Sequence, residues 1–260
     1  MANTVFDNKI IEAKAKDLLT TSVNTRSLMT IDSSLAEQSG MTKTINTYTY
    51  SGAAEELEAG QGNTAENRGK IIFTSNDYKV KRVQQAFDYT DDDFHKDNTI
   101  VDNMLKGANQ VMVNKMTADF LTEAAKATLT QSFSNAIGYE AIVDAISQLN
   151  LEDESGIFVV IPNAWKAALR KDADYKAARM GEVVYNGQVG TICGIPVIAS
   201  KALTDTAYCM TKDAVKLFIK KDVEAEQDRD KDKKINSVYL SAYYVCALVD
   251  ATKICKITKS

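Results

Sequence analysis

Alternating apolar and polar side chains predict two long strands in the first third of the chain. From Thr42 to Tyr50 the residues alternate between two faces, one of which carries β-branched side chains. A second strand region is predicted from Lys70 to Tyr89, and a change of phase between Val80 and Val83 indicates a β-bulge within it. These two segments are therefore a candidate strand pair.

The segment between the two strands, Ser51 to Gly69, contains little that could pack in a core. It holds four of the twelve glycines of the chain and one large apolar residue, Leu57. Loops longer than about 12–15 residues are uncommon in compact domains and tend to be functional. We therefore predict a projecting flap that packs against something outside its own domain.

Helical periodicity appears in three other parts of the chain. It is weak in the first 35 residues, which otherwise read as an extended arm. It is strong from about Asn98 to Ser132, where apolar residues recur at three- and four-residue steps and predict one helix about 50 Å long. The acidic cluster Asp91 to Asp93 precedes this helix and suits the positive end of its dipole. A shorter amphipathic helix is predicted after Gly138.

The remainder of the chain reads mostly as strand. Ile157 to Ile161 is a fully apolar run closed by Pro162, and Asn163 is placed to cap a short helix. The last third is predicted to be β-structure interrupted by the charged segment from Asp222 to Lys234. Long helices and strands in this order predict an α+β fold.

Composition disfavours several classes of function. The formal net charge of −4 is unfavourable for direct binding to nucleic acid, which needs Lys and Arg to displace counterions. The chain has neither a run of about 18 apolar residues nor the features of a signal peptide, so we expect no membrane partner and synthesis in the cytosol.

Candidate chemical groups are few. His95 is the one histidine and lies in a polar, acidic stretch, where a surface or capping role is expected. The four cysteines are far apart without a C-x-x-C pair, which predicts buried free thiols. Asp228 to Asp232 resembles the start of a calcium loop but lacks its glycine and its closing glutamate. We therefore predict no catalytic residue, cofactor or metal, and an enzyme or binding module using His95 is a remote alternative.

Two segments carry a resemblance to a known family. Ile157 to Asn163, followed by Trp165 to Leu169, is similar to a buried strand and short helix of tailed-phage capsid proteins. Gly187 to Ile198 resembles their "G-x-x-G-x-x-x-G-x-P-V" turn and strand. Taken with the order of the other elements, the chain resembles the Hong Kong 97 fold of tailed-phage major capsid proteins, which encapsulins share.

The resemblance implies a division into four parts. Residues 1–35 would be the N-terminal arm, and residues 36–90 the extended β-hairpin loop, with Glu58-Ala59-Gly60 near its tip. Residues 91–135 and 222–260 would form the peripheral domain with its spine helix. Residues 136–221 would form the axial domain.

The implied function is structural. A major capsid protein assembles with itself into hexamers and pentamers, which form an icosahedral or prolate shell around double-stranded phage DNA without sequence-specific binding. Assembly would occur in the bacterial cytoplasm and place the chain in the virion capsid. An encapsulin-type protein compartment is the alternative.

The partners follow from the same resemblance. A portal is expected, and the arm begins so close to Met1 that a separate scaffolding protein, or none, is expected instead of a fused one. Contacts between subunits are expected in the flap and in the arm. The residues expected to make them are Glu55, Glu56, Leu57, Glu58, Arg68, Ile10 and Leu18.

Overall fold

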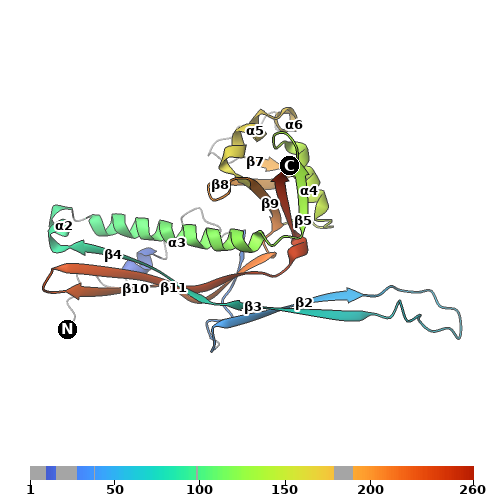
Figure 1. Cartoon of the computed structure of the whole chain (residues 1–260), viewed down its shortest axis with the longest axis horizontal. Coiled ribbons are helices and arrows are strands. Elements are labelled where there is room, and N and C mark those ends of the chain that lie inside the picture. Colours follow the sequence, from blue (N-terminus) through green and yellow to red (C-terminus); the bar gives the residue numbers. More distant parts are fainter. Residues whose placement is uncertain (1–9, 16–27, 38, 98, 179–189) are drawn as a thin grey trace.

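The computed structural model describes residues 10–15, 28–37, 39–97, 99–178 and 190–260. Figure 1 shows an elongated body, a compact unit standing on one side of it, and a two-stranded ribbon that leaves the body and ends in an open loop. The described strands form sheets of four, six and two members. Helices and strands occur together in the body and in the compact unit, so the predicted α+β class is confirmed.

The body contains the four-stranded sheet, which is built around a long antiparallel hairpin. Strands β10 (Val215–Asp230) and β11 (Ile235–Leu248) form this hairpin. Strand β1 (Thr30–Asp32) lies parallel to β10 at one edge, and β4 (Lys81–Thr90) lies antiparallel to β11 at the other. Strands β1 and β4, which are far apart in the sequence, thus pair with the two sides of one hairpin.

The charged segment Asp222 to Lys234 does not interrupt these strands, so that expectation was wrong. It forms the distal half of β10 and the turn that leads into β11. Val223 and Ala225 are buried, whereas Glu226, which follows Ala225 and points to the other face, is exposed. The segment therefore keeps the alternation of a half-buried strand, and its many charges lie on the solvent face.

Helix α3 (Ile100–Ala124) lies along one face of the four-stranded sheet (Figure 1). The prediction that it continues to Ser132 was wrong, because residues 129–133 form strand β5 (Leu129–Phe133). Thr128 and Thr130 are β-branched and weak helix formers, and the backbone of this segment is paired with another strand. With 25 residues, α3 is about 37 Å long.

The acidic cluster lies in a helix of its own, not directly before α3. Asp91, Asp92 and Asp93 form the first turn of α2 (Asp91–Lys96). The Thr90 hydroxyl accepts a hydrogen bond from the Asp93 backbone N–H at 3.1 Å, and the Asp93 carboxylate accepts the hydroxyl proton of Thr90 at 2.7 Å. These bonds to Thr90 lower the pKa of Asp93.

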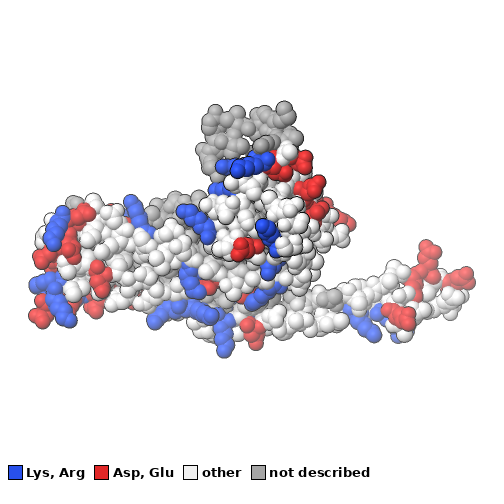
Figure 2. Space-filling view, turned by 45° about the horizontal axis from the view of Figure 1, so that its top comes forward, with Lys and Arg blue, Asp and Glu red and all other residues white. Residues whose placement is uncertain are grey.

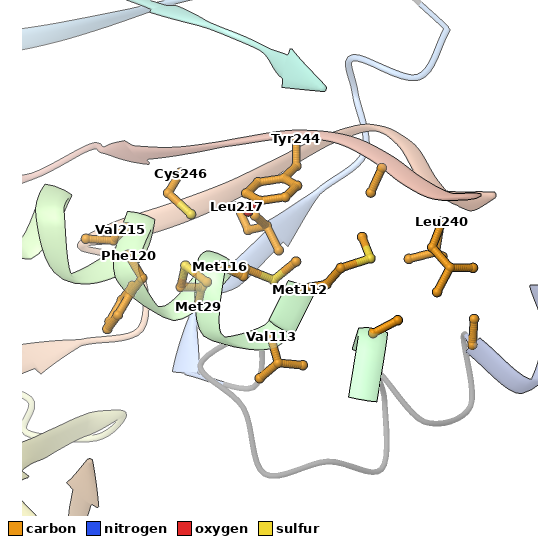
Figure 3. Close-up of a cluster of buried hydrophobic side chains, with 14 of the residues drawn as sticks. Met29, Met112, Val113, Met116, Phe120, Val215, Leu217, Leu240, Tyr244 and Cys246 are labelled. Carbon is orange, nitrogen blue, oxygen red and sulfur yellow. The ribbon is translucent and has the colours of Figure 1, made fainter. Parts of the chain in front are cut away.

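One apolar core fills the space between α3 and the hairpin (Figure 3). Met112, Met116 and Phe120 of α3 are at most 4% exposed and pack in the same cluster as the sheet residues. The Tyr244 hydroxyl donates a hydrogen bond to the Asp119 carboxylate at 3.1 Å, and burial raises the Tyr244 pKa. The sheet contributes Val215, Leu217, Leu240, Tyr244 and Cys246 to this core.

The compact unit holds the six-stranded sheet, in the order β5-β12-β9-β6-β8-β7. Its central strand β6 (Ile157–Pro162) is buried at every position, as its apolar sequence predicts. The other strands are β12 (Ile254–Lys259), β9 (Thr206–Thr211), β8 (Ile195–Ser200) and β7 (Gly190–Ile192). Gly187 to Val189, part of the predicted turn motif, lie outside the described residues.

Helices cover this second sheet. Helix α4 (Tyr139–Gln148) buries Ile142 and Ile146 in the core of the compact unit, as predicted. The short helices η2 (Asn163–Trp165), α5 (Lys166–Lys171) and α6 (Ala173–Ala178) follow β6. The Trp165 ring meets Phe133 edge to face, with centroids 5.1 Å apart.

The sheets depart from the expected domain boundaries. Strands β5 and β12 were expected in the peripheral domain but lie in the six-stranded sheet, where they are parallel neighbours. Residues 215–221 were expected in the axial domain but belong to β10 of the four-stranded sheet. The turn η3 (Ala251–Lys253) carries the chain from one unit to the other. Strand pairing between distant segments, which a linear division ignores, causes these differences.

Removing a buried ring from α3 should destabilise the body. Phe120 is 0% exposed, so we expect Phe120→Ala to lower the free energy of unfolding by about 3–5 kcal/mol. Val111 lies on the same helix but is 49% exposed, and Val111→Ala should change it by less than about 1 kcal/mol. Urea unfolding of the unassembled subunit measures both. Equal losses in the two variants would contradict the packing of Phe120 between α3 and the sheet.

Candidate inter-subunit surfaces

The ribbon consists of β2 (Thr42–Ser51), β3 (Lys70–Lys79) and the tip, residues 52–69. Figure 1 shows it extending away from the rest of the molecule. The two strands pair antiparallel from Thr42 and Lys79 to Ser51 and Lys70. A two-stranded hairpin alone is marginally stable in water. The stability of the ribbon therefore depends on its cross-strand contacts and on the surface against which it packs.

One face of the ribbon changes from polar to apolar toward the tip. Near the body, Thr44 donates a hydrogen bond to Asp77 at 2.6 Å, and Ser75 donates one to Asn46 at 2.7 Å. Farther out, the rings of Tyr48 and Phe73 meet edge to face at 5.1 Å. Tyr50 and Ile71 are the next register pair on that face.

The outer half of this face is an exposed apolar patch. We define the patch as Tyr48, Tyr50, Ile71 and Phe73, whose side chains are 57–69% exposed. Ile72, on the opposite face, is 59% exposed as well. Contiguous exposed apolar surface of this kind marks an interaction site in a soluble protein. The contact residues expected from the sequence lie in the loop and in the arm and do not include these strand residues, although the alternation from Tyr48 to Tyr50 is visible in the sequence.

The tip has an internal structure although it forms no strand. The Glu55 carboxylate accepts hydrogen bonds from the Thr64 backbone N–H at 2.8 Å and the Thr64 hydroxyl at 2.6 Å. It also accepts one from the Asn67 side chain. The bonds from Thr64 lower the Glu55 pKa. One carboxylate thus ties the two sides of the tip together.

The base of the tip is closed by a contact that requires glycine. A Cβ added to Gly69 would overlap the ring of Tyr50, and a Cβ added to Gly52 would lie 2.8 Å from the Gly69 Cα. The Tyr50 ring can therefore lie across the backbone at this point only because Gly69 has no side chain. This contact fixes the position of one member of the apolar patch.

A small separate core anchors the root of the ribbon. We define the root cluster as the five buried residues Leu35, Ile45, Val80, Phe218 and Ala247. The Val80 N–H donates to the Met41 carbonyl at 2.7 Å, and the Tyr78 hydroxyl donates to the Leu248 carbonyl at 3.1 Å. The bulge expected between Val80 and Val83 is instead a break between β3 and β4 at Val80.

The described part of the arm packs on its own chain. Residues 10–15 are helical, with Ile11 and Ala15 buried in the core beneath α3. Lys14 forms an ion pair with Asp102 of α3 at 2.9 Å. Ile10, one of the predicted contact residues, is 54% exposed, whereas Leu18 lies outside the described residues.

The predicted contact residues of the tip lie together at the far end of the ribbon. Glu56, Leu57, Glu58 and Arg68 are exposed, whereas Glu55 is partly buried by its bonds to Thr64 and Asn67. Figure 2 shows acidic side chains at this end of the molecule and Lys and Arg side chains along the edge of the body near the root. The two ends of the ribbon thus differ in charge.

Groups capable of catalysis do not gather in the described structure. His95 is exposed at the end of α2, with its ring beside Phe94. Among the described residues, no group of three or more His, Cys, Asp or Glu side chains is placed to hold a metal ion. No helix in the described part of the chain is long and apolar enough to cross a membrane.

All four cysteines are free thiols, but they are not all buried. Cys209, Cys246 and Cys255 are buried, and burial raises the pKa of Cys209 and Cys246 to about 12. The prediction was wrong for Cys193, which is exposed. Cys193 lies in the turn between β7 and β8 with φ of 51°, and its Sγ is 3.2 Å from the Tyr139 hydroxyl.

Solved structures share this architecture. The capsid of Cyanophage P-SCSP1u matches with a TM-score of 0.69 and 12% identity, over 90% of this chain and 86% of that chain. An encapsulin complex from Synechococcus elongatus PCC 7942 matches with a TM-score of 0.65 and 11% identity, over 99% of this chain and 91% of that chain. The expected Hong Kong 97 fold is confirmed.

Sequence comparison identifies the family. The major capsid protein of Staphylococcus phage phiMR11 is 27% identical over 236 residues, which cover 88% of this chain and 84% of that protein. The model of the family described as "Phage capsid protein" matches residues 74–257, from the ribbon strand β3 to the final strand β12. Since this match spans most of the sequence, the chain belongs to the phage capsid protein family.

Proposed function

We propose that this chain is the major capsid protein of a tailed bacteriophage, assembling into hexamers and pentamers that close into an icosahedral or prolate shell around double-stranded DNA. Membership of the family gives the chain a structural role in a capsid made of many copies. The ribbon and its exposed apolar patch support the association of copies with one another, whereas the hexamers, the pentamers and the enclosed DNA are proposed from the family. The virion capsid is its place of function, and the cytoplasm of the bacterial host is the proposed place of assembly.

The apolar patch is the observation that carries this proposal. Four large side chains on one ribbon face are more than half exposed. Full burial of a large apolar side chain contributes about 1.5–3 kcal/mol of favourable free energy. Covering the patch with another surface would therefore stabilise the complex. The ribbon points away from its own body (Figure 1), so the covering surface belongs to another molecule. In a shell of identical copies, that molecule is a neighbouring subunit.

The predicted contact residues divide into those that would contact a neighbouring subunit and one that acts inside the tip. We propose that Glu56, Leu57, Glu58 and Arg68 of the tip, together with Ile10 and Leu18 of the arm, contact neighbouring subunits. We propose that Glu55 acts mainly inside the tip, where it accepts hydrogen bonds from Thr64 and Asn67. A tip that is already ordered loses less conformational entropy when it docks.

The four-part division is retained as a proposal with adjusted boundaries. Strands β5 and β12 are assigned to the axial domain because they pair with each other and β12 pairs with β9. Residues 215–221 are assigned to the peripheral domain because they form the start of β10. The arm and the ribbon keep the ranges 1–35 and 36–90.

Other components of the particle are proposed from the family. A separate scaffolding protein and a portal are the expected protein partners. The net charge of −4 agrees with a wall that encloses DNA without binding it tightly. An encapsulin-type compartment shares the fold and is distinguished by its contents, because purified particles would then hold a protein cargo instead of DNA.

Assembly of the purified chain tests the proposal. Negative-stain microscopy and light scattering, alone and with a candidate scaffolding protein, should show shells, tubes or capsomers. The double variant Tyr48→Ser/Phe73→Ser should remain folded, because both side chains are exposed, and should reduce the particle yield at least about tenfold. The matched change Asn46→Ala/Ser75→Ala, nearer the root on the same face, should have a much smaller effect. A persistent monomer in every condition would contradict the proposal.

Removal of the Glu55 carboxylate should open the tip. In Glu55→Gln an acceptor oxygen is replaced by a donating amide, so the tip cannot keep all of its hydrogen bonds from Thr64 and Asn67. We expect amide hydrogen exchange within residues 52–69 to become several-fold faster while the body is unchanged. Glu56→Gln is the control, because no hydrogen bond or ion pair of the Glu56 carboxylate is present among the described residues.

The same contact should depend on pH in a defined direction. Because the folded tip lowers the Glu55 pKa below its usual 4.5, its contribution is complete above that value and disappears as pH falls through the lowered pKa. After correction for intrinsic exchange, protection of the wild-type tip should be constant from neutral pH to about 4.5 and decrease in stronger acid. Equal loosening by Glu56→Gln would exclude this role of Glu55.

A further inference from the structure

Among the described residues, the chain passes between the body and the compact unit three times. Residues 125–128 lead from α3 to β5, residues 212–214 from β9 to β10, and residues 249–253 from β11 to β12. We refer to these three segments as the neck. The Val249 N–H donates a hydrogen bond to the Ala214 carbonyl at 2.9 Å, and the Thr128 hydroxyl donates one to the Ala251 carbonyl at 3.4 Å. Each segment of the neck is therefore bonded to another.

The two units also share an apolar contact. Phe158 and Met210 of the compact unit are at most 2% exposed and belong to the same core cluster as α3 and the hairpin. Apolar burial is not directional, so this contact holds the units together without fixing the angle between them. Hydrogen bonds prefer a donor angle above about 150°. The groups that bond to the neck are therefore better suited to fix that angle.

The arm bonds to the neck through Thr30 of β1. The Thr30 N–H donates to the Lys212 carbonyl at 3.2 Å, and the Thr30 hydroxyl donates to the Asp213 carboxylate at 2.7 Å. Pairing of Thr30 with Lys216 of β10 holds β1 beside these residues. The arm thus contacts the segment 212–214.

The ribbon contacts the other two segments through Tyr78 of β3. The Tyr78 hydroxyl donates to the carbonyl of Leu248, the residue that precedes the segment 249–253, at 3.1 Å. In the segment 125–128, Lys126 Nζ lies over the Tyr78 ring, 5.5 Å from its centroid, and pairs with Glu123 at 2.7 Å. Burial and the charge of Glu123 raise the pKa of Tyr78, so its hydroxyl remains a donor at neutral pH.

We propose that Tyr78 and Thr30 form a clamp on the neck, which fixes the orientation of the compact unit relative to the body. When the ribbon or the arm moves away from the neck, the directional bonds are lost while the apolar contact remains, and the compact unit is free to turn. The orientation of the compact unit is thereby coupled to the positions of the ribbon and the arm. The inference goes beyond the proposed function, because the clamp acts within one subunit.

The distance between two spin labels tests the clamp in the unassembled full chain. Cys193 is exposed in the compact unit and takes one label, whereas Cys209, Cys246 and Cys255 are buried and protected from the reagent. Asp92→Cys supplies the second site, on the exposed surface of α2 at the far end of the body (Figure 1). Pulsed electron paramagnetic resonance then gives the distribution of distances between the two units. With the clamp intact, this distribution should be single and narrow.

Removal of the clamping groups should widen the distribution. Tyr78→Phe removes the hydrogen bond to Leu248, and Thr30→Val removes the hydroxyl bond to Asp213 with little change in volume. The double variant should widen the distribution at least about twofold, because the compact unit then samples more orientations. Adding Lys126→Gln, which removes the cation over the Tyr78 ring, should widen it further.

Matched controls are available in the body. Tyr239→Phe removes a hydroxyl from β11, and no hydrogen bond of this hydroxyl is present in the described part of the chain. Lys115 pairs with Asp119 within α3, as Lys126 pairs with Glu123, but it lies outside the neck. Tyr239→Phe and Lys115→Gln should leave the distribution unchanged. Circular dichroism should be the same for every variant, which shows that each of them is folded.

The outcomes separate the clamp from the shell function. A double variant that keeps the wild-type distribution would overturn the clamp, because its hydrogen bonds would then not determine the orientation. Equal widening in the two controls would also overturn it, since the effect would not depend on the neck. Neither result affects the shell function, because the measurement uses single subunits. Failure of the chain to form particles would overturn the shell function and leave the clamp intact.

Discussion

The long hairpin β10–β11 must have one face covered, and α3 is the element that covers it. Its strands have 16 and 14 residues, and their apolar positions on one face would be exposed to water without the helix. Met112, Met116 and Phe120 supply the complementary surface. The edge strands β1 and β4 pair with the outer sides of this hairpin, so their positions also follow from it. Through β4, the same sheet determines where the ribbon leaves the body.

Two kinds of surface result from this arrangement. The sheet and helix of the body bury their apolar residues against each other, as in any soluble domain. The ribbon keeps large apolar side chains exposed, and it has its own anchor in the root cluster. A subunit built in this way can fold before it assembles, because the core of the body does not depend on the surfaces left for neighbouring copies.

The sequence predicts elements well where local pattern and final environment agree. The strand Thr42 to Tyr50, the buried run Ile157 to Ile161 and the helix after Gly138 all form as expected. The errors occur where pairing with a distant segment determines the secondary structure. Leu129–Phe133 is a strand because β12 pairs with it, and the charged half of β10 is a strand because β11 continues beside it. Neither partner can be read from the local sequence.

The candidate surface was only partly predictable for the same reason. A polar flap is visible in the sequence because glycine and glutamate are concentrated there. The joining of Tyr48, Tyr50, Ile71 and Phe73 on one face depends on the register of β2 with β3, which periodicity alone does not give. The role of Glu55 inside the tip likewise depends on Thr64 and Asn67, nine and twelve residues away.

The root of the ribbon has a mechanical consequence. Both strands are fixed to the same body, β2 through its residue Ile45 and β3 through Val80, which directly follows it, so the ribbon is held at both of its chain ends. A pull on the tip along the strands is shared by two covalent backbones, and the hydrogen bonds between them are not loaded in shear. In a capsid under internal pressure, we therefore expect the contact between the ribbon and the neighbouring subunit to fail before the ribbon itself does.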